Sequence, residues 1–365
     1  MPQVTFKVRG KALCSGGETP EHALRRPSDR LHKVISTVQT LKLRFTCGNP
    51  MQRIPMAAVA ASLGIVWNLL WAADATDPLT RAIQVGSANE WNRPQEPMRI
   101  YGNTYYVGVA GLSSILIATD KGLIVLDGDL PQSVPLIEAN IAKLGFRVRD
   151  VKFILNSHAH FDHAGGIAAL ARDSGAEVLV SPSGAAALRA GRATPDDPQA
   201  GYADSKRAEP AIFPPVAANI REVHDGQVLH LGHVSVAAHF TPGHTPGSTT
   251  WTWTDCVDGR CLHIVYADSL NAISAPGFHF LADENHPDLT ASFRRSIRTV
   301  GALPCDILLT VHPDLAGIPH KLEQLQAGAT KNPFIDAQAC TAYVRDAEAR
   351  LDSRITEEKS QHTPL

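Results

Sequence analysis

Charge is scarce in this sequence and nearly balanced. Of its 365 residues only 19% are charged, and the formal net charge is −2. Without a surplus of basic residues the chain offers little electrostatic attraction for the backbone of a nucleic acid, so no nucleic-acid partner is expected. Hydrophobic residues make up 44% of the chain, which is enough to bury a large core and does not predict wholesale disorder.

Long hydrophobic runs are also lacking. The longest, residues 56–71, is shorter than the roughly 20 residues that cross a membrane comfortably. It follows Arg53 and precedes Ala-Asp-Ala at 73–75, which has the small-x-small form of a cleavage site. This layout predicts a secretory signal peptide at 51–75 and makes residues 1–50 an over-extended start. An amino-terminal membrane anchor or a real additional domain are the alternatives.

Removal of residues 1–75 would take away ten of the 34 basic and four of the 36 acidic residues. The mature chain, 76–365, would then hold 24 basic and 32 acidic residues and would be distinctly acidic. We expect it in the periplasm, without stable membrane association, and as a monomer.

Cysteines are few as well, six in total, and two of them precede residue 76. The other four form two candidate pairs, Cys256–Cys261 across a turn and Cys305–Cys340 between a strand and the carboxy-terminal helix. An even number of cysteines behind a signal peptide favours disulfides, with four free buried thiols as the alternative.

What the sequence does contain is a dense group of titratable side chains, SHAHFDHAGG, at 157–166. His158, His160, Asp162 and His163 fall within six positions, a pattern with a chance probability on the order of one in a thousand. The strand-like run VKFILN precedes them and a helix of small residues follows. The motif therefore lies at the carboxyl end of a strand, where open α/β sheets bind ligands. Imidazoles with a carboxylate beside them suit zinc and can begin two metal sites.

Two further histidines lie at strand ends, His244 in TPGHTPGS and His312 in LLTVHPD. Each is a weak signal alone, because a single histidine at a strand end is usually a polar terminus. Together with the motif they give six metal donors at strand-to-loop junctions, which we expect to meet at one edge of the fold.

The remaining patterns form two successive halves, each with strands before helices and with no linker between them. This order predicts two packed sheets with helices outside, a four-layer αβ/βα sandwich. The long loop at 191–215 is uncommon in a compact domain unless it serves a site. The expected strands are 104–110, 113–119, 122–128, 151–156 and 176–180 in the first half, and 221–223, 227–231, 233–240, 248–254, 263–269 and 306–311 in the second. The expected helices are 131–144, 164–172, 182–190 and 288–300, with further helices after 311.

The segments HAHFDH, TPGHTPGS, YADS and TVHPD, in this order, resemble the metallo-beta-lactamase superfamily over roughly residues 90–350. Within it the chain is similar to the third subclass of the class B enzymes, through Asp162-His163, YADSL with Ser269, ALPCDILLTVHP and the placement of Cys305 and Cys340. The resemblance implies the same sandwich fold and two zinc ions. One zinc would be bound by His158, His160 and His244, and the other by Asp162, His163 and His312.

The resemblance also implies an activity, hydrolysis of the β-lactam amide of penicillins, cephalosporins and carbapenems by a hydroxide between the zincs, and so antibiotic resistance. Asp162 would be the catalytic residue that orients this hydroxide. Ser269 and Asn271 are candidate contacts for the substrate carboxylate. Asp127 is a candidate acceptor for a ligand histidine or else a turn residue. Phe278 stands where the subclass often has tyrosine, so a hydrogen bond from that position is in doubt.

Other hydrolases of the superfamily, such as lactonases and glyoxalase-like thioesterases, share the six ligands. In those an aspartate often bridges the metals, and Asp268 could be that residue. A di-iron redox protein is disfavoured by His160 and by the lack of a flavin domain, and a nuclease by the lack of basic surface and of an inserted cap domain. A non-enzymatic metal protein would need a missing ligand, and none is missing. The expected mature chain also has no S-x-x-K run to supply a serine nucleophile.

Overall fold

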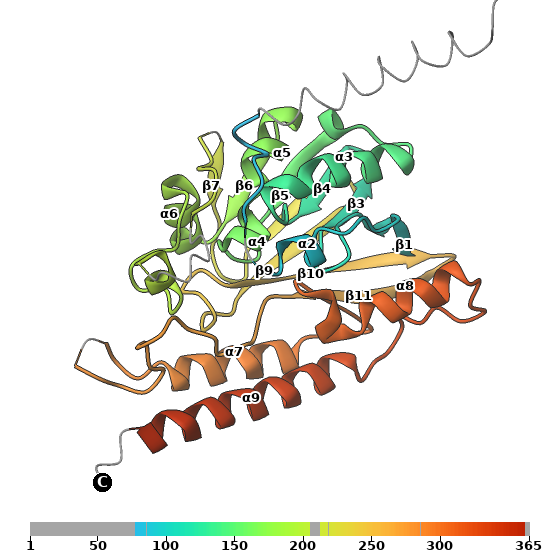
Figure 1. Ribbon diagram of the computed structural model, residues 1–365. Helices are drawn as coiled ribbons and strands as arrows, with labels where there is room; N and C mark the ends of the chain where they lie inside the picture. The colour runs from blue at the N-terminus through green and yellow to red at the C-terminus, as the bar shows by residue number, and fades with distance from the viewer. Residues whose placement is uncertain (1–76, 85, 205–211, 218, 285, 362–365) are drawn as a thin grey trace, which may run out of the picture. The chain divides into compact units, whose positions relative to one another are not determined.

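Two β-sheets packed face to face form the centre of the fold, and helices cover the outer face of each (Figure 1). The computed structural model describes residues 77–84, 86–204, 212–217, 219–284 and 286–361. The expected extension, 1–50, and the expected signal peptide, 51–75, lie outside the described residues. The four-layer αβ/βα sandwich predicted from the sequence is confirmed.

The first sheet has the strand order β1-β2-β3-β4-β5-β6-β7. Strands β1 to β4 pair antiparallel, whereas β4 to β7 pair in parallel. Its central strands read as continuous apolar runs because both of their faces are covered. The strands are β1 (Met98–Tyr101), β2 (Thr104–Tyr106), β3 (Ile115–Thr119), β4 (Gly122–Leu126), β5 (Val151–Leu155), β6 (Glu177–Val180) and β7 (Ile220–Glu222).

The helices on this side are short and rich in small residues, which lets them pack closely on the sheet. The α6 helix begins at a serine cap, Ser181, whose hydroxyl accepts a hydrogen bond from Gly184 N, and it ends at Gly191 in the left-handed conformation. The helices are α2 (Ala88–Trp91), α3 (Val134–Lys143), α4 (Phe161–Ala164), α5 (Ile167–Ser174) and α6 (Pro182–Ala190).

The second sheet has the order β12-β11-β10-β9-β8, with only the β11–β12 pair parallel. Its strands are β8 (Val228–Leu231), β9 (Val234–Phe240), β10 (Thr249–Val257), β11 (Arg260–Ala267) and β12 (Ile307–Thr310). Helices α7 (Thr290–Ala302) and α9 (Ala339–Gln361) run along its outer face in Figure 1, and α8 (Ile318–Gln326) follows β12. None of the described helices is long and apolar enough to cross a membrane.

Large side chains from both sheets fill the space between them, among them Tyr106, Trp251 and Tyr266, each almost completely buried. Burying a side chain of this size contributes roughly 1.5–3 kcal/mol to stability. The strand ends that bear the histidines are therefore fixed on a rigid core.

Both expected disulfides are present. Cys256 and Cys261 form a cross-strand pair between β10 and β11, with an S–S distance of 2.03 Å. Cys305 and Cys340 are joined in the same way and tie the start of β12 to α9. The cysteine pairing predicted from the sequence is confirmed.

Three local expectations need correction. The strand at 221–223 was expected in the second half, but β7 pairs in parallel with β6 and completes the first sheet. The helix expected at 164–172 begins only at Ile167, as α5, and a separate short helix that was not expected, α4, lies inside the histidine motif. Strand β1 was not expected, because its four residues, MRIY, alternate too little to stand out.

Candidate metal centre

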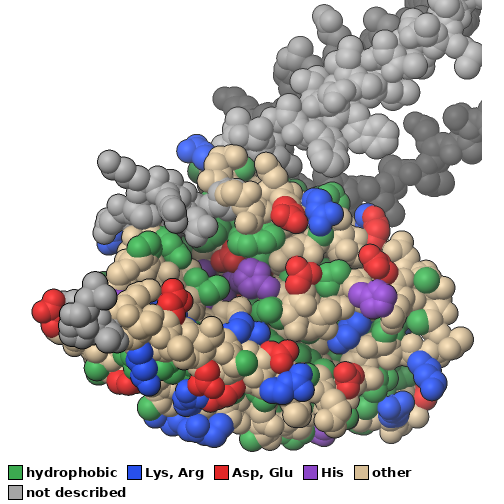
Figure 2. Space-filling view, turned by 60° about the horizontal axis from the view of Figure 1, so that its bottom comes forward, with side chains coloured by type: hydrophobic (Ala, Val, Ile, Leu, Met, Phe, Trp, Pro, Cys, Tyr) green, Lys and Arg blue, Asp and Glu red, His purple; other side chains and the backbone are tan. Residues whose placement is uncertain are grey.

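Three strand ends and one turn of helix bring the six expected donors together. His158 and His160 follow β5 in extended backbone, and Asp162 and His163 lie in α4. His244 comes from the turn between β9 and β10, and His312 from the end of β12. Figure 2 shows histidine side chains gathered beside a carboxylate in a hollow of the face turned to the viewer.

The first group, which we call the tris-histidine cluster, consists of His158, His160 and His244. All three side chains are buried, and one donor atom from each lies within 4.8 Å of the others. Each ring has its other nitrogen held by a neighbouring oxygen: His158 Nδ1 lies 2.6 Å from Asp268 Oδ1, His160 Nε2 3.1 Å from Asp197 Oδ2, and His244 Nδ1 2.9 Å from the carbonyl oxygen of Asn271. These contacts fix the ring orientations and leave the second nitrogen of each ring for a metal. On His244 this nitrogen, Nε2, has one long contact, 3.4 Å from Gln199 Nε2.

The second group, the aspartate cluster, consists of Asp162, His163 and His312. Asp162 Oδ2 lies 3.3 Å from His163 Nε2 and 3.4 Å from His312 Nε2, and the two ring nitrogens are 3.3 Å apart. Tetrahedral zinc with donors at about 2.1 Å holds those donors roughly 3.4 Å from one another. The three atoms therefore already have the spacing that one zinc ion requires.

An unsatisfied atom supports the same interpretation. Among the described residues, His158 Nε2 is buried without a hydrogen-bond partner, and an orphaned buried polar atom is costly unless something binds it. A metal ion at the tris-histidine cluster would satisfy it. The side chains present thus fit zinc at both clusters.

Protonation differs between the candidate ligand histidines. Burial lowers the pKa of His244 and of His312 to about 4, with help from the neighbouring histidines. Burial also opposes the charged form of His163, but Asp162 outweighs it and raises the pKa of His163 to about 9. Because a metal binds only the deprotonated ring, His163 would have to lose a proton for zinc to bind there.

Comparison with known proteins agrees with this geometry. Residues 107–257 match the family model of the metallo-beta-lactamase superfamily. The structure of MEM-A1, a subclass B3 metallo-beta-lactamase from a soil metagenome library, is 46% identical, with a TM-score of 0.69 over 74% of this chain and 99% of that one. The Rm3 metallo-beta-lactamase is 49% identical, with a TM-score of 0.69 over 74% of this chain and 97% of that one. This chain belongs to the metallo-beta-lactamase superfamily.

A curated superfamily relative has another activity in its name. Hydroxyacylglutathione hydrolase of Anaeromyxobacter dehalogenans (strain 2CP-C) is 34% identical over 164 residues, which cover 45% of this chain and 46% of that protein. The chain therefore spans about half the length of the curated relatives it matches.

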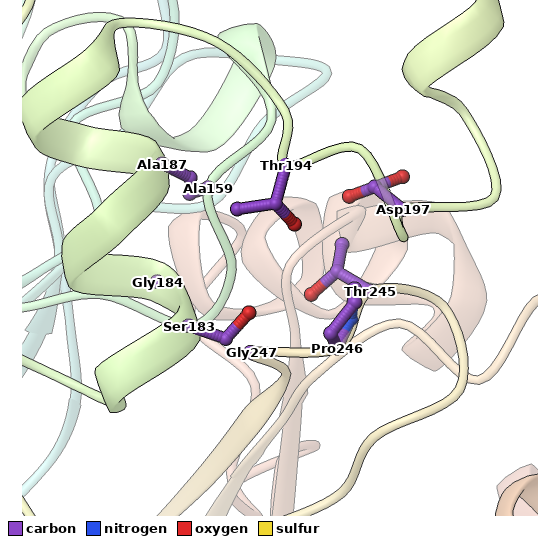
Figure 3. A pocket seen from close by; sticks show the side chains of 9 residues that line it. All are labelled: Ala159, Ser183, Gly184, Ala187, Thr194, Asp197, Thr245, Pro246 and Gly247. Carbon is purple, nitrogen blue, oxygen red and sulfur yellow. The ribbon is translucent and has the colours of Figure 1, made fainter.

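One residue of this metallo-beta-lactamase superfamily site was missed by the sequence analysis. Asp197 lies in the long loop at 191–215, is 4% exposed and accepts hydrogen bonds from His160 and from the amide of Gln199. It borders a small cavity together with Thr194 and Thr245 (Figure 3). The only signal for it in the sequence was the length of the loop.

The role expected of Asp127 needs correction. Its carboxylate accepts hydrogen bonds from Ser157 N and Oγ, Asn156 Nδ2 and Tyr266 OH, and not from a ligand histidine. Asp127 therefore supports the histidine motif through its hydrogen bonds with Ser157, the residue before His158. The acceptor for His158 is Asp268 instead, and both side chains of that pair are fully buried.

The candidate substrate contacts lie beside the tris-histidine cluster. Ser269 is 1% exposed, and within the described part of the chain its hydroxyl and Asn271 Oδ1 have no hydrogen-bond partner. Phe278 stacks on His286, with 4.6 Å between ring centroids and 18° between planes. Contact of Ser269 and Asn271 with a substrate remains a prediction.

Proposed function

We propose that this protein is a zinc-dependent β-lactamase that hydrolyses the amide bond of penicillins, cephalosporins and carbapenems and confers resistance to them. The observation that supports this most is the joint presence of both donor clusters in a chain 46–49% identical to metallo-beta-lactamases across 97–99% of their lengths. The partner would be the small-molecule antibiotic.

Two bound zinc ions would supply a Lewis acid for the lactam carbonyl and lower the pKa of the attacking water. Residues of the chain would orient the attacking water and hold the substrate. Asp162 directs Oδ2 toward His163 and His312, which leaves Oδ1 to accept a hydrogen bond from the water and orient it. Ser269 and Asn271 would hold the substrate carboxylate and so place the lactam carbonyl over the tris-histidine cluster.

Hydrolysis of a thioester or a lactone is the second candidate, favoured by the hydroxyacylglutathione hydrolase relative. It would be expected to use Asp268 as a bridge between metals. In the structure Asp268 Oδ1 is already engaged with His158 Nδ1 at 2.6 Å, a contact that orients a ligand ring. Asp268 Oδ2 has no hydrogen-bond partner among the described residues, so the substrate test below decides between the two candidates.

The experiment that separates the two offers the zinc-loaded protein a penicillin, a carbapenem, a lactone and a glutathione thioester side by side. We expect the β-lactams to be opened, the activity to be lost to a chelator, and zinc to restore it. Hydrolysis of the lactone or the thioester with every β-lactam left intact would contradict the proposal and support the second candidate.

We also propose export to the periplasm by the segment at 51–75. Expression from Met51, followed by amino-terminal sequencing of the exported protein, tests this. A product beginning near Thr76 is expected, and a product that retains residues 56–71 would contradict it.

A further inference from the structure

An apolar groove lies beside the metal centre. It has a volume of about 720 Å³, within the range of small-molecule sites. One wall includes Pro242 and Pro246, which flank His244 at two positions on either side, and the facing loop contributes Pro195 and Pro198. Phe278 and Leu289, with His286 and Pro287, form a further wall. A substrate bound over His244 would therefore have an apolar surface next to it.

The wall that contains Phe278 belongs to a segment with no helix or strand of its own. Residues 268–281 connect the end of β11 to the approach of α7, so the backbone groups there cannot satisfy one another in a regular ladder. A wall of this kind keeps its position only if other elements supply hydrogen bonds.

Helix α9 supplies them through Glu358. This carboxylate is 1% exposed and accepts hydrogen bonds from the amides of Phe280, at 2.8 Å, and Leu281, at 3.0 Å. Burial alone would raise the pKa of Glu358, but hydrogen bonds from Arg354 and from these amides outweigh it and keep that pKa below its usual value. The carboxylate is therefore charged at neutral pH and binds both amides strongly.

Arg354, one turn earlier on α9, completes the contact. Its Nε donates to Glu358 Oε1 at 2.7 Å, and its terminal nitrogen donates to Ser274 Oγ and to the carbonyl oxygen of Phe278, both at 2.8 Å. One ion pair thus fixes the segment on either side of Phe278.

The same helix also fixes the end of the segment that reaches the metal ligands. Tyr343 OH donates to the carbonyl oxygen of Asp268 at 2.8 Å and accepts from the amide of Leu270 at 3.1 Å. Asp268 in turn holds His158. The groove wall and the support of a ligand histidine are therefore both anchored on α9, but by different residues.

We propose that Arg354 and Glu358 are positioning residues for substrate specificity, which hold the Phe278 wall so that the groove accepts an apolar or aromatic acyl substituent of the substrate. The proposal rests on the β-lactamase function proposed above. It assigns the lactam ring to the metal centre and the acyl substituent to the groove, and neither residue touches the reacting atoms.

The test compares two substrates that differ only in that substituent, a penicillin with an aromatic acyl group and the penicillin nucleus with a free amine. In Glu358→Gln and Arg354→Ala we expect KM to rise about tenfold for the first and to stay unchanged for the second. In both variants kcat should stay within about twofold and the zinc content should not change. Glu357→Gln, at an exposed neighbouring position of α9, is the matched control.

Amide hydrogen exchange gives a readout independent of turnover. Exchange at Phe280 and Leu281 should be faster in Glu358→Gln than in the wild type, with no change in α4. Equal changes in KM for both substrates, loss of zinc, or unchanged exchange would overturn the proposal while leaving the β-lactamase function in place. Absence of β-lactam hydrolysis by the wild-type protein would overturn both.

Discussion

The tris-histidine cluster and the aspartate cluster start from the same six-residue motif but are held in different ways. In the tris-histidine cluster each ring is oriented by an oxygen from outside the cluster. In the aspartate cluster the donors face one another, with Asp162 Oδ2 between His163 and His312. The first is organised for a metal by its surroundings, whereas the second contains a charge pair of its own, between Asp162 and His163. The two should respond differently to mutation and to pH.

The largest effect is expected from the residue that belongs to the aspartate cluster and also orients the water. Asp162→Ala should lower kcat by about 10³-fold or more, since both a metal ligand and the positioning of the nucleophile are lost. Steady-state kinetics at saturating zinc measures this. A loss no greater than that of Ser269→Ala would mean that the roles of the two residues are assigned wrongly.

The next effect separates the clusters by pH. His163 has a pKa raised to about 9, so below that pH zinc competes with a proton and its affinity should fall about tenfold per pH unit. Between pH 9 and pH 7 the aspartate cluster should lose about 100-fold in affinity. The tris-histidine cluster should lose less, because burial lowers the pKa of His158 and of His244. Only His160 competes for a proton there, because Asp197 outweighs burial and raises its pKa.

Two variants allow each cluster to be titrated alone. His312→Ala leaves the tris-histidine cluster complete, and His244→Ala leaves the aspartate cluster complete. Zinc affinity of each is measured by competition with a chelator at pH 9, 8 and 7. Equal slopes in the two variants would contradict the difference described here.

A smaller effect tests the external support of the tris-histidine cluster. In the His312→Ala background, Asp197→Asn should weaken zinc binding about tenfold, because His160 loses its charged acceptor. Asp196→Asn, an exposed neighbour in the same loop, is the control. An unchanged zinc affinity in Asp197→Asn would show that the contact with His160 does not organise the cluster.

The smallest effect is expected outside both clusters. Ser269→Ala should cost about 1 kcal/mol, seen as a rise in KM with little change in kcat, because its hydroxyl helps only to hold the substrate. Unchanged zinc affinity in this variant checks that neither cluster is disturbed. A fall in kcat with KM unchanged would place Ser269 in the chemical step instead.

The sequence predicted the parts of the site whose residues are close together or rigidly placed. The motif at 158–163 has four donors in six positions, and His244 and His312 stand beside prolines at strand ends. The order of strand-like and helix-like segments was enough for the sandwich fold, because buried strands appear as short apolar runs and helices as longer periodic segments.

The residues that the sequence did not reveal contact partners far away in the sequence, and no motif surrounds them. Asp197 reaches His160 across 37 positions from an irregular loop. Glu358 reaches Phe280 across 78 positions from a helix whose other charges are mostly exposed. In the sequence such residues look like ordinary loop and surface charges, and only the packed structure shows what they touch.

Because the donors are far apart in the sequence, the two clusters become complete only late in folding. A nascent chain that has reached residue 240 holds four donors in the motif, but each cluster still lacks the histidine that completes it, His244 or His312. Zinc bound by a complete cluster would therefore favour only the finished topology, in which β10 and β12 are already docked, and would stabilise that state against every earlier one. If both clusters bind zinc as proposed, metal capture would be a late, selective step of folding, and a chain truncated before residue 312 should fail to retain a second ion.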